Sequence, residues 1–323
     1  MAMTLKEKYK DYFLIGAALS DTSLDTHKDI ILREFNSVTC RWQMKFGIIA
    51  PDAVNYNFGP ADRIYNFALD NDIAIRYHAI LWHTQAPDVL FEKDREEVLR
   101  AFRAHIKTMA GRYGSGIYAC DVVNEAIDDK HGFFMRQSNW QQKLGDQLCD
   151  IAFSAAREAM PSNVDLYYND YNECNPEKSQ KIYQLVKSMQ ERGIPIDGIG
   201  MQGHWNIESP TMDEIKRTIE LYASLGVKIQ ITELDMSVYN HRELSDLTAP
   251  TPEMVKKQIK AYKDIFAIFR NYKDVIDSVT TWGVADDETW LLHHPVKEGR
   301  LNWPLIFDAN HEPKEIYNAI MDF

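Results

Sequence analysis

Two glutamates follow directly on β-prone stretches of this 323-residue sequence. Glu125 closes the run Ile117-Tyr-Ala-Cys-Asp-Val-Val-Asn124, and Glu233 closes the run Val227-Lys-Ile-Gln-Ile-Thr232. A short β-prone run bounded by polar residues is typical of a buried parallel strand, so each carboxylate is expected at a strand's carboxyl end. Two such carboxylates facing one another can split a glycosidic bond, one as acid and the other as nucleophile. We therefore predict that Glu125 and Glu233 form a catalytic pair.

The strands that carry these glutamates belong to a longer series. β-rich runs recur along the whole chain and alternate with segments whose apolar residues have helical spacing. The predicted strands are Phe13 to Ala17, Ser37 to Thr39, Ile73 to His78, Ile117 to Val123, Val164 to Asn169, Gly198 to Gln202, Val227 to Thr232 and Ser278 to Trp282. Eight β/α units without a Gly-, Pro- or Ser-rich linker predict an α/β fold, a single (β/α)₈ barrel domain over residues 1–323. A doubly wound open sheet is the alternative, but no Gly-rich phosphate loop follows the first strand.

Helical segments can be placed from their apolar stripes and caps. One stripe runs from Leu99 to Tyr113, another from Leu144 to Ala155, and a third from Val255 to Phe269. A capping residue followed by proline is typical of a helix start. Ser209-Pro210 and Thr251-Pro252 therefore predict two helix starts.

In a barrel, the carboxyl ends of all eight strands meet on one face. The residues at these strand ends are therefore predicted to form the site. The side chains expected there are Lys45, His78, Trp82, His83, Asn124, Glu125, Asn169, Asp170, Asn172, Gln202, His204, Trp205, Glu233, Asp235, Trp282, Asp286 and Trp290. Amides, carboxylates and aromatic rings with few cations suit a sugar cleft better than a phosphate site.

His204 is the expected support of the nucleophile. It can bond to Glu233 and be held in turn by Asp235, which would fix the charge and orientation of the carboxylate. An alternative role as metal ligands can be considered for His78 and His83, together with Asp170. No His-x-x-x-His spacing or acid-rich loop completes such a set, so we expect neither a metal nor a cofactor.

Composition restricts the partners. The net charge of −12 is spread along the chain, which argues against nucleic acid and anionic membrane as partners. The N-terminal residues lack the apolar core of a signal peptide, and no apolar stretch reaches about 18 residues, so a cytoplasmic location is expected. The four cysteines lack CxxC spacing and are expected as buried free thiols. Whether the chain forms a homo-oligomer stays open.

Eight short blocks in this order closely resemble the family-ten glycoside hydrolases, the retaining endo-1,4-β-xylanases, over nearly the whole chain. The blocks are Phe35-Asn-Ser-Val-Thr39, Met44-Lys45-Phe46, Leu81-Trp-His-Thr-Gln85, Asp121-Val-Val-Asn-Glu-Ala126, Tyr168-Asn-Asp-Tyr-Asn172, Gly200-Met-Gln-Gly-His-Trp205, Ile231-Thr-Glu-Leu-Asp235 and Thr281-Trp-Gly-Val-Ala-Asp286. The resemblance implies cleavage of β-1,4-xylosidic bonds in xylan or xylo-oligosaccharides by a double displacement.

The resemblance also implies roles for individual residues. Glu125 is the acid/base, Glu233 the nucleophile and His204 its support. Asn124 is expected to bond the 2-hydroxyl of the sugar being cleaved, and Gln202 to lie near the acid/base. The residues expected to line the sugar-binding subsites on the glycone side are Lys45, His78, Trp82, Gln85, Trp282 and Trp290.

The chain also departs from the family pattern. Arg41 and Trp42 stand where the family normally has a glutamate and an asparagine that hold the second glycone sugar, and Tyr77 stands where it has glycine. The other departures are Ala79 for threonine, Val89 for tryptophan and Cys120 for a frequent tryptophan. Arg41, Trp42 and Tyr77 thus predict an altered subsite. This leaves two alternatives open, a glycan-binding barrel with poor turnover and a remodelled cleft for a different small ligand.

Overall fold

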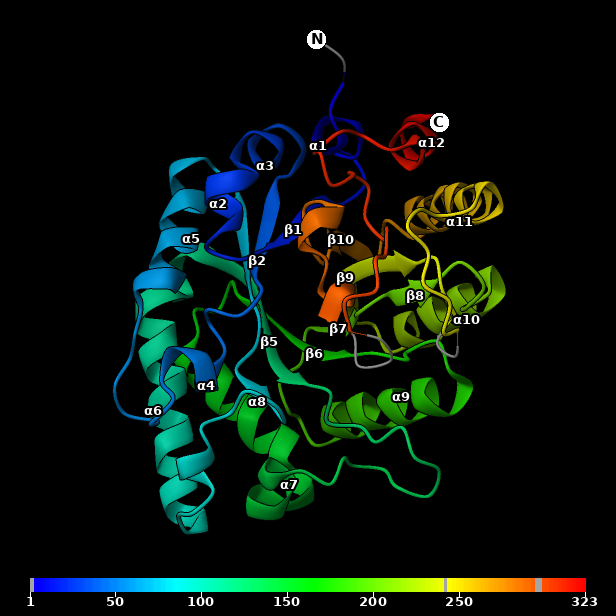
Figure 1. Ribbon diagram of the computed structural model, residues 1–323. Helices are drawn as coiled ribbons and strands as arrows, with labels where there is room; N and C mark the ends of the chain where they lie inside the picture. Colours follow the sequence, from blue (N-terminus) through cyan, green and yellow to red (C-terminus); the bar gives the residue numbers. More distant parts are fainter. Residues whose placement is uncertain (1–2, 241–242, 294–297) are drawn as a thin grey trace.

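A closed barrel of eight parallel strands forms the centre of the molecule (Figure 1). The computed structural model describes residues 3–240, 243–293 and 298–323. The barrel strands are β1 (Leu14–Leu19), β2 (Ser37–Cys40), β3 (Ala74–Tyr77), β5 (Ile117–Asn124), β6 (Asp165–Asp170), β7 (Gly198–Met201), β9 (Lys228–Ser237) and β10 (Ile276–Thr281). The sheet closes because β10 pairs with β1 on one side and with β9 on the other. The (β/α)₈ prediction is therefore confirmed, and the open sheet is excluded.

Helices surround the strands as an outer ring (Figure 1). They are α1 (Leu5–Lys8), α2 (Ser23–Thr26), α3 (Lys28–Glu34), α4 (Phe46–Ile49), α5 (Gly59–Asp70), α6 (Arg95–Tyr113), α7 (Asn139–Leu144), α8 (Leu148–Ala159), α9 (Pro176–Glu191), α10 (Met212–Ala223), α11 (Pro252–Asn271) and α12 (Glu315–Met321). Two short strands extend the sheet at its carboxyl end, since β4 (Leu81–Trp82) pairs with β5 and β8 (His204–Asn206) pairs with β9. No helix in the described ranges is long and apolar enough to cross a bilayer.

Local signals located some helix ends and missed others. Thr251 caps α11 through Met254 N, with Pro252 in its first turn, as predicted. The predicted start at Ser209-Pro210 is wrong, because α10 begins at Met212 after Thr211, whose side chain and Glu214 form a reciprocal capping box. The apolar stripe from Leu144 to Ala155 is divided between α7 and α8, since Gly145 (φ +72°) ends α7.

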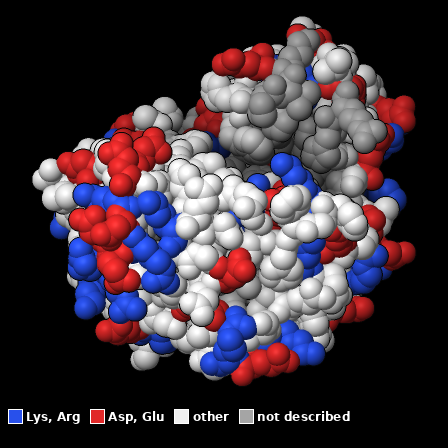
Figure 2. Space-filling view, turned by 90° about the horizontal axis from the view of Figure 1, so that it is seen from below, with Lys and Arg blue, Asp and Glu red and all other residues white. Residues whose placement is uncertain are grey.

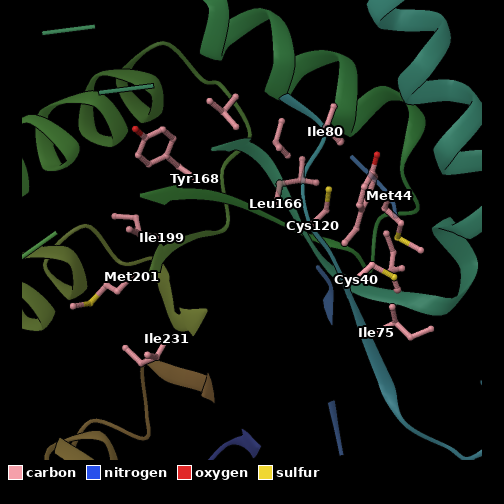
Figure 3. Packing of buried hydrophobic residues seen from close by; sticks show 14 of the residues in the cluster. Cys40, Met44, Ile75, Ile80, Cys120, Leu166, Tyr168, Ile199, Met201 and Ile231 are labelled. Atoms are coloured by element: carbon pink, nitrogen blue, oxygen red, sulfur yellow. The ribbon is translucent and has the colours of Figure 1, made fainter. Parts of the chain in front are cut away.

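The core lies between the strands and the helix ring. Figure 3 shows apolar side chains of successive strands turned to this layer, among them Ile75, Cys120, Leu166, Ile199 and Ile231, all without solvent exposure. All four cysteines are buried free thiols, as predicted.

The first and last helices pack together. Figure 1 places α1 beside α12, and the Nζ of Lys8 donates a hydrogen bond of 2.7 Å to the carbonyl oxygen of Phe323. Tyr9 donates a second hydrogen bond to the carbonyl oxygen of Ile320. On the face shown in Figure 2, basic side chains lie among acidic ones rather than in a patch of one sign.

Candidate active site

A cavity of about 470 Å³ opens at the carboxyl ends of the barrel strands. The predicted residues that line it are Trp42, Lys45, His78, Trp82, Asn124, Glu125, Asn172, Gln202, His204, Trp205, Glu233, Asp235, Trp282 and Trp290. The two glutamates, which lie on strands far apart in the sequence, therefore border the same space.

Glu125 follows the last residue of β5 and is held by neutral donors. Its Oε2 accepts a hydrogen bond of 2.8 Å from Trp82 Nε1, and its Oε1 accepts from Gln202 Nε2 at 3.0 Å and from Asn124 Nδ2 at 3.2 Å. The backbone of Glu125 has φ +60°, a conformation that costs free energy for a residue other than glycine. Its backbone N–H donates to Asn169 O, which helps to hold this turn at the strand end.

Glu233, on β9, has cationic neighbours instead. Its Oε2 lies 3.2 Å from His204 Nε2, and its Oε1 accepts 2.8 Å from Asn169 Nδ2 and lies 3.9 Å from His78 Nδ1. Burial alone would raise the pKa of Glu233. The positive charges of His78, His204 and Lys45 outweigh burial and lower this pKa from 4.5 to about 2. Glu233 is therefore ionised at neutral pH.

His204 connects Glu233 to Asp235, which lies two residues further along the same strand. Its Nδ1 is 3.0 Å from Asp235 Oδ2, which also accepts a hydrogen bond of 2.6 Å from Trp290 Nε1. Burial by itself would lower the pKa of His204. The two carboxylates have the larger and opposite effect, and they raise this pKa to about 10. The imidazolium thus donates to both carboxylates, in the arrangement that the sequence predicts.

Three amide side chains link the two glutamates. Gln202 Nε2 donates to Glu125 Oε1 and also, at 3.2 Å, to Asn124 Oδ1. Asn169 Nδ2 donates 2.9 Å to the same Asn124 oxygen and 2.8 Å to Glu233 Oε1. The NH₂ groups of Gln202 and Asn169 are each shared between two acceptors, and Asn124 Oδ1 accepts from both of them. A displacement of one amide would therefore be passed on to both carboxylates.

Lys45 brings a positive charge into an aromatic surrounding. Its Nζ lies 4.2 Å from the centre of the Trp82 ring, 5.2 Å from that of Trp42 and 6.0 Å from that of Trp282. Only 2% of Lys45 is exposed, and this burial lowers its pKa to about 8, although Glu233 and Glu125 act in the opposite direction. The cation and the three indoles form one wall of the cavity.

Besides Arg41 and Tyr77, five predicted residues do not line the cavity: His83, Gln85, Asn169, Asp170 and Asp286. Asn169 is fully buried and contributes through the amide hydrogen bonds that link the two glutamates. Gln85 borders a small pocket on the other side of Lys45 and Trp82. Asp170 pairs with Lys178 at 3.1 Å, and Asp286 pairs with Lys314 at 2.9 Å, so both carboxylates have partners outside the cavity.

The prediction that Arg41 and Tyr77 alter a subsite is corrected by their positions. The guanidinium of Arg41 donates 2.8 Å to Trp282 O and 2.9 Å to Glu288 O, so it is bound to backbone behind the cavity wall. Tyr77 has no exposure and lies against His105 of α6, with its hydroxyl 3.5 Å from His105 Nε2.

The reason for the Tyr77 position is strand alternation. Because successive side chains of a strand point to opposite faces, Tyr77 points out to the helix layer while His78 points into the cavity. Of the three residues on which the altered subsite rested, only Trp42 lines the cavity. The remodelled-cleft alternative thereby loses two of its three supporting residues.

Several cavity residues were missed by the sequence reasoning: Tyr171, Ser237, Tyr239, Asn240, Leu291, Arg300 and Asn302. Two of them had a usable signal. The strand that carries Glu233 runs on to Ser237, so alternation places residues 233, 235, 237 and 239 on one face. Leu291 lies in a short 3₁₀ helix (Trp290–His293) and the others lie on loops, where spacing gives no direction.

The alternative metal-ligand set is not brought together in the part of the chain that the structure describes. His78 Nδ1 bonds Asp121 Oδ2 at 2.8 Å, His83 Nδ1 lies 3.6 Å from Glu125 Oε2, and Asp170 pairs with Lys178. Each side chain therefore has a different neighbour.

Comparison with known proteins agrees with this geometry. The glycosyl hydrolase family 10 model matches residues 4–323. The endo-1,4-beta-xylanase A of Caldicellulosiruptor saccharolyticus is 48% identical over 99% of this chain and 96% of its own length.

Solved structures give the same result. The crystal structure of xylanase XynB from Paenibacillus barcinonensis is 47% identical, with a TM-score of 0.97 over 99% of this chain and 98% of that chain. The endo-1,4-beta-xylanase of Caldicellulosiruptor owensensis is 45% identical, with a TM-score of 0.97 over the whole of both chains. This chain therefore belongs to glycosyl hydrolase family 10.

Proposed function

We propose that this protein is a retaining endo-1,4-β-xylanase, which hydrolyses β-1,4-xylosidic bonds in xylan or xylo-oligosaccharides. Family membership and relatives described as endo-1,4-beta-xylanases support this substrate. The observation that carries the mechanism is the contrast between two glutamates on one cavity. Cationic groups surround Glu233, whereas the hydrogen-bond donors to the carboxylate of Glu125 are neutral.

This contrast assigns the two roles. Glu233, ionised beside His204, attacks the anomeric carbon, and the acetal bond to the leaving sugar breaks as Glu125 gives its proton to the leaving oxygen. In the second step Glu125 removes a proton from water, and the water oxygen displaces Glu233 from the anomeric carbon. His204 acts as a positioning residue, because it keeps the nucleophile charged and fixed.

The remaining cavity residues bind the sugar. Asn124 lies between the two carboxylates, where the 2-hydroxyl of the sugar being cleaved would contact its amide. Trp82, Trp282 and Trp290 offer apolar ring faces to the pyranose rings, while Lys45 can donate to hydroxyls. Amides and carboxylates already ordered by mutual hydrogen bonds need little rearrangement when a substrate binds.

Trp42 shortens the glycone side of this cleft. Its indole takes the place of a family asparagine and borders the cavity beside Lys45. An amide that could bond sugar hydroxyls is thus replaced by an apolar ring. We expect weak binding of the second glycone sugar and unimpaired chemistry at the bond that is cleaved.

Residues 1–323 would work as one catalytic domain. The barrel closes through its first and last strands, and α1 packs against the segment that follows α12. Both ends of the chain are therefore tied to the same barrel.

The proposed function is tested by following xylo-oligosaccharide hydrolysis with NMR that resolves the anomers. The expected first product is the β-anomer, which mutarotates only later. An α-anomer as first product would contradict the retaining mechanism. Tight oligosaccharide binding without product would show a glycan-binding protein instead.

A further inference from the structure

A cluster of two histidines and one carboxylate lies outside the cavity. His27 lies between α2 and α3. Asp287 is in the turn Asp286–Glu288, which follows β10, and His311 is in the turn before α12. None of the three lines the active-site cavity, and the xylanase mechanism uses none of them. The cluster joins three segments that are far apart in the sequence.

The geometry of the cluster is compact. Asp287 Oδ1 lies 3.0 Å from His27 Nε2, and Asp287 Oδ2 lies 3.2 Å from His311 Nε2. One ligand atom of each residue lies within 4.8 Å of the others. Two ligands at Zn²⁺ bond lengths in a tetrahedral site lie about 3.3 Å apart, which is close to the 3.0 and 3.2 Å contacts of the two histidines with Asp287.

The two ring nitrogens of His27 have different neighbours. Nδ1 lies 2.7 Å from Thr26 Oγ1, and the same hydroxyl oxygen lies 3.2 Å from Thr22 O. Nε2 faces Asp287, so it is the nitrogen of His27 that can reach an ion at the carboxylate.

Metal-binding histidines commonly donate their second ring N–H to a neighbouring oxygen, and Thr26 Oγ1 is such an oxygen beside His27 Nδ1. The His311 ring lies against the His27 ring, with centroids 4.1 Å apart and planes inclined by 38°, so both imidazoles are at hand for one ion.

Exposure and charge also suit an ion. His27 is buried, whereas the side chains of Asp287 and His311 are 36% and 32% exposed, which leaves one side of the cluster open to water. Burial would raise the pKa of Asp287, but its hydrogen bonds to the two histidines lower it, so its carboxylate is ionised at neutral pH.

We propose that His27 Nε2, His311 Nε2 and a carboxylate oxygen of Asp287 bind a divalent transition-metal ion of the Zn²⁺ type. Two imidazoles and one carboxylate are a ligand set that zinc accepts, and water takes the fourth position on the exposed side.

The ion would hold the start of the barrel to its end. Asp287 is next to Glu288, whose Oε2 accepts 2.7 Å from Ser23 Oγ and whose carbonyl accepts from Arg41. The segments that carry the three ligands are therefore already in contact without a metal. Metal binding to this folded arrangement raises the free energy of unfolding by mass action.

The test uses the whole protein freed of metals with a chelator. Co²⁺, which replaces Zn²⁺ with similar ligands, should give the visible absorption of four-coordinate cobalt at one ion per chain. Zn²⁺ at about 100 times its dissociation constant should raise Tm by about 3 °C or more. His311→Gln and Asp287→Asn should each remove the cobalt signal and at least most of the Tm rise.

His131→Gln is the matched control, because His131 also pairs with a carboxylate, Glu177 at 3.2 Å, but is almost fully exposed. It should leave both signals unchanged. The proposal is overturned if Co²⁺ gives no such absorption, or if the absorption and the Tm rise persist in His311→Gln. It is equally overturned if His311→Gln lowers Tm by the same amount with and without metal, since the cluster would then be a hydrogen-bonded clamp.

Discussion

Tyr77 and Cys120 are direct register partners on the adjacent parallel strands β3 and β5, and neither side chain is exposed. In the family that the sequence resembles, the corresponding residues are a glycine and frequently a tryptophan. A large and a small side chain have thus exchanged strands at one point of the core. An exchange of this kind keeps the buried volume similar and leaves room for a bulky tyrosine next to His78, which lines the cavity.

The first prediction tests this exchange through stability. Tyr77→Gly removes a buried aromatic ring and should cost about 3–5 kcal/mol in the free energy of unfolding. Cys120→Trp alone adds bulk against Tyr77 and should cost about 1–3 kcal/mol or more. The double variant should be more stable than the sum of the two losses predicts, by about 1–3 kcal/mol.

Urea unfolding of the four proteins measures these differences. The hydroxyl of Tyr77 lies near His105 Nε2, so the double variant need not reach the stability of the parent. Simple addition of the two losses would show that residues 77 and 120 do not share one space. Cys149→Ala, at a buried thiol on α8, is the control that should not couple to Tyr77→Gly.

The alternation of strands and helices was predictable because each barrel strand is a short, β-rich run. The same geometry predicted where Glu125 and Glu233 lie, since a parallel barrel brings all carboxyl ends together. Strand alternation also places Tyr77 on the face opposite to His78, whereas the position of Arg41 was not predictable in this way. Arg41 follows the last residue of β2 and bonds to carbonyls of a distant loop, which spacing does not reveal.

Features formed by several distant segments were also hidden in the sequence. His27, Asp287 and His311 come together only because β10 closes the barrel against β1. The shared amides of Asn124, Asn169 and Gln202 depend on side-chain orientations at the ends of three strands. The cytoplasmic location stays a prediction.

The second prediction separates the roles of the two glutamates. Glu125→Gln should lower kcat for xylotriose by about 100- to 10,000-fold, because the sugar leaving group needs a proton. An aryl β-xyloside with an acidic phenol leaves without that proton, so its first turnover should remain fast and phenol release should show a burst. Glu233→Gln should abolish turnover of both substrates, since no nucleophile remains.

Glu173→Gln is the control for these two variants. Glu173 is a buried glutamate whose Oε1 accepts from Gly203 N and Trp205 Nε1, while its Oε2 has no hydrogen-bond partner among the described residues, so an amide fits there. It should keep most of the activity. A Glu233→Gln enzyme that still turned over the aryl xyloside would exclude Glu233 as the nucleophile.

The third prediction concerns pH. The positive charge of His204 is one of the causes that lower the pKa of Glu233 to about 2. In His204→Gln that charge is lost, so the Glu233 pKa rises and the nucleophile becomes protonated at higher pH. The acidic limb of the kcat/KM profile for xylotriose should therefore move to higher pH by at least about one pH unit.

The profile of His131→Gln is the reference for His204→Gln, because the exposed His131 lies outside the cavity. Its acidic limb should match that of the parent. A His204→Gln enzyme with lower kcat but an unmoved acidic limb would mean that His204 orients Glu233 without tuning its charge.

The fourth prediction addresses Trp42, the departure from the family pattern that faces the cavity. Trp42→Asn should restore an amide for hydroxyls of the second glycone sugar, a gain of about 1–2 kcal/mol or roughly tenfold in kcat/KM for xylotriose and longer chains. An aryl β-xyloside, which places a single sugar on the glycone side, should gain little. Arg41→Glu is the comparison: it removes the donors to Trp282 O and Glu288 O, so it should lower Tm without raising activity. A gain from Arg41→Glu and none from Trp42→Asn would reverse our assignment of which side chain limits the cleft.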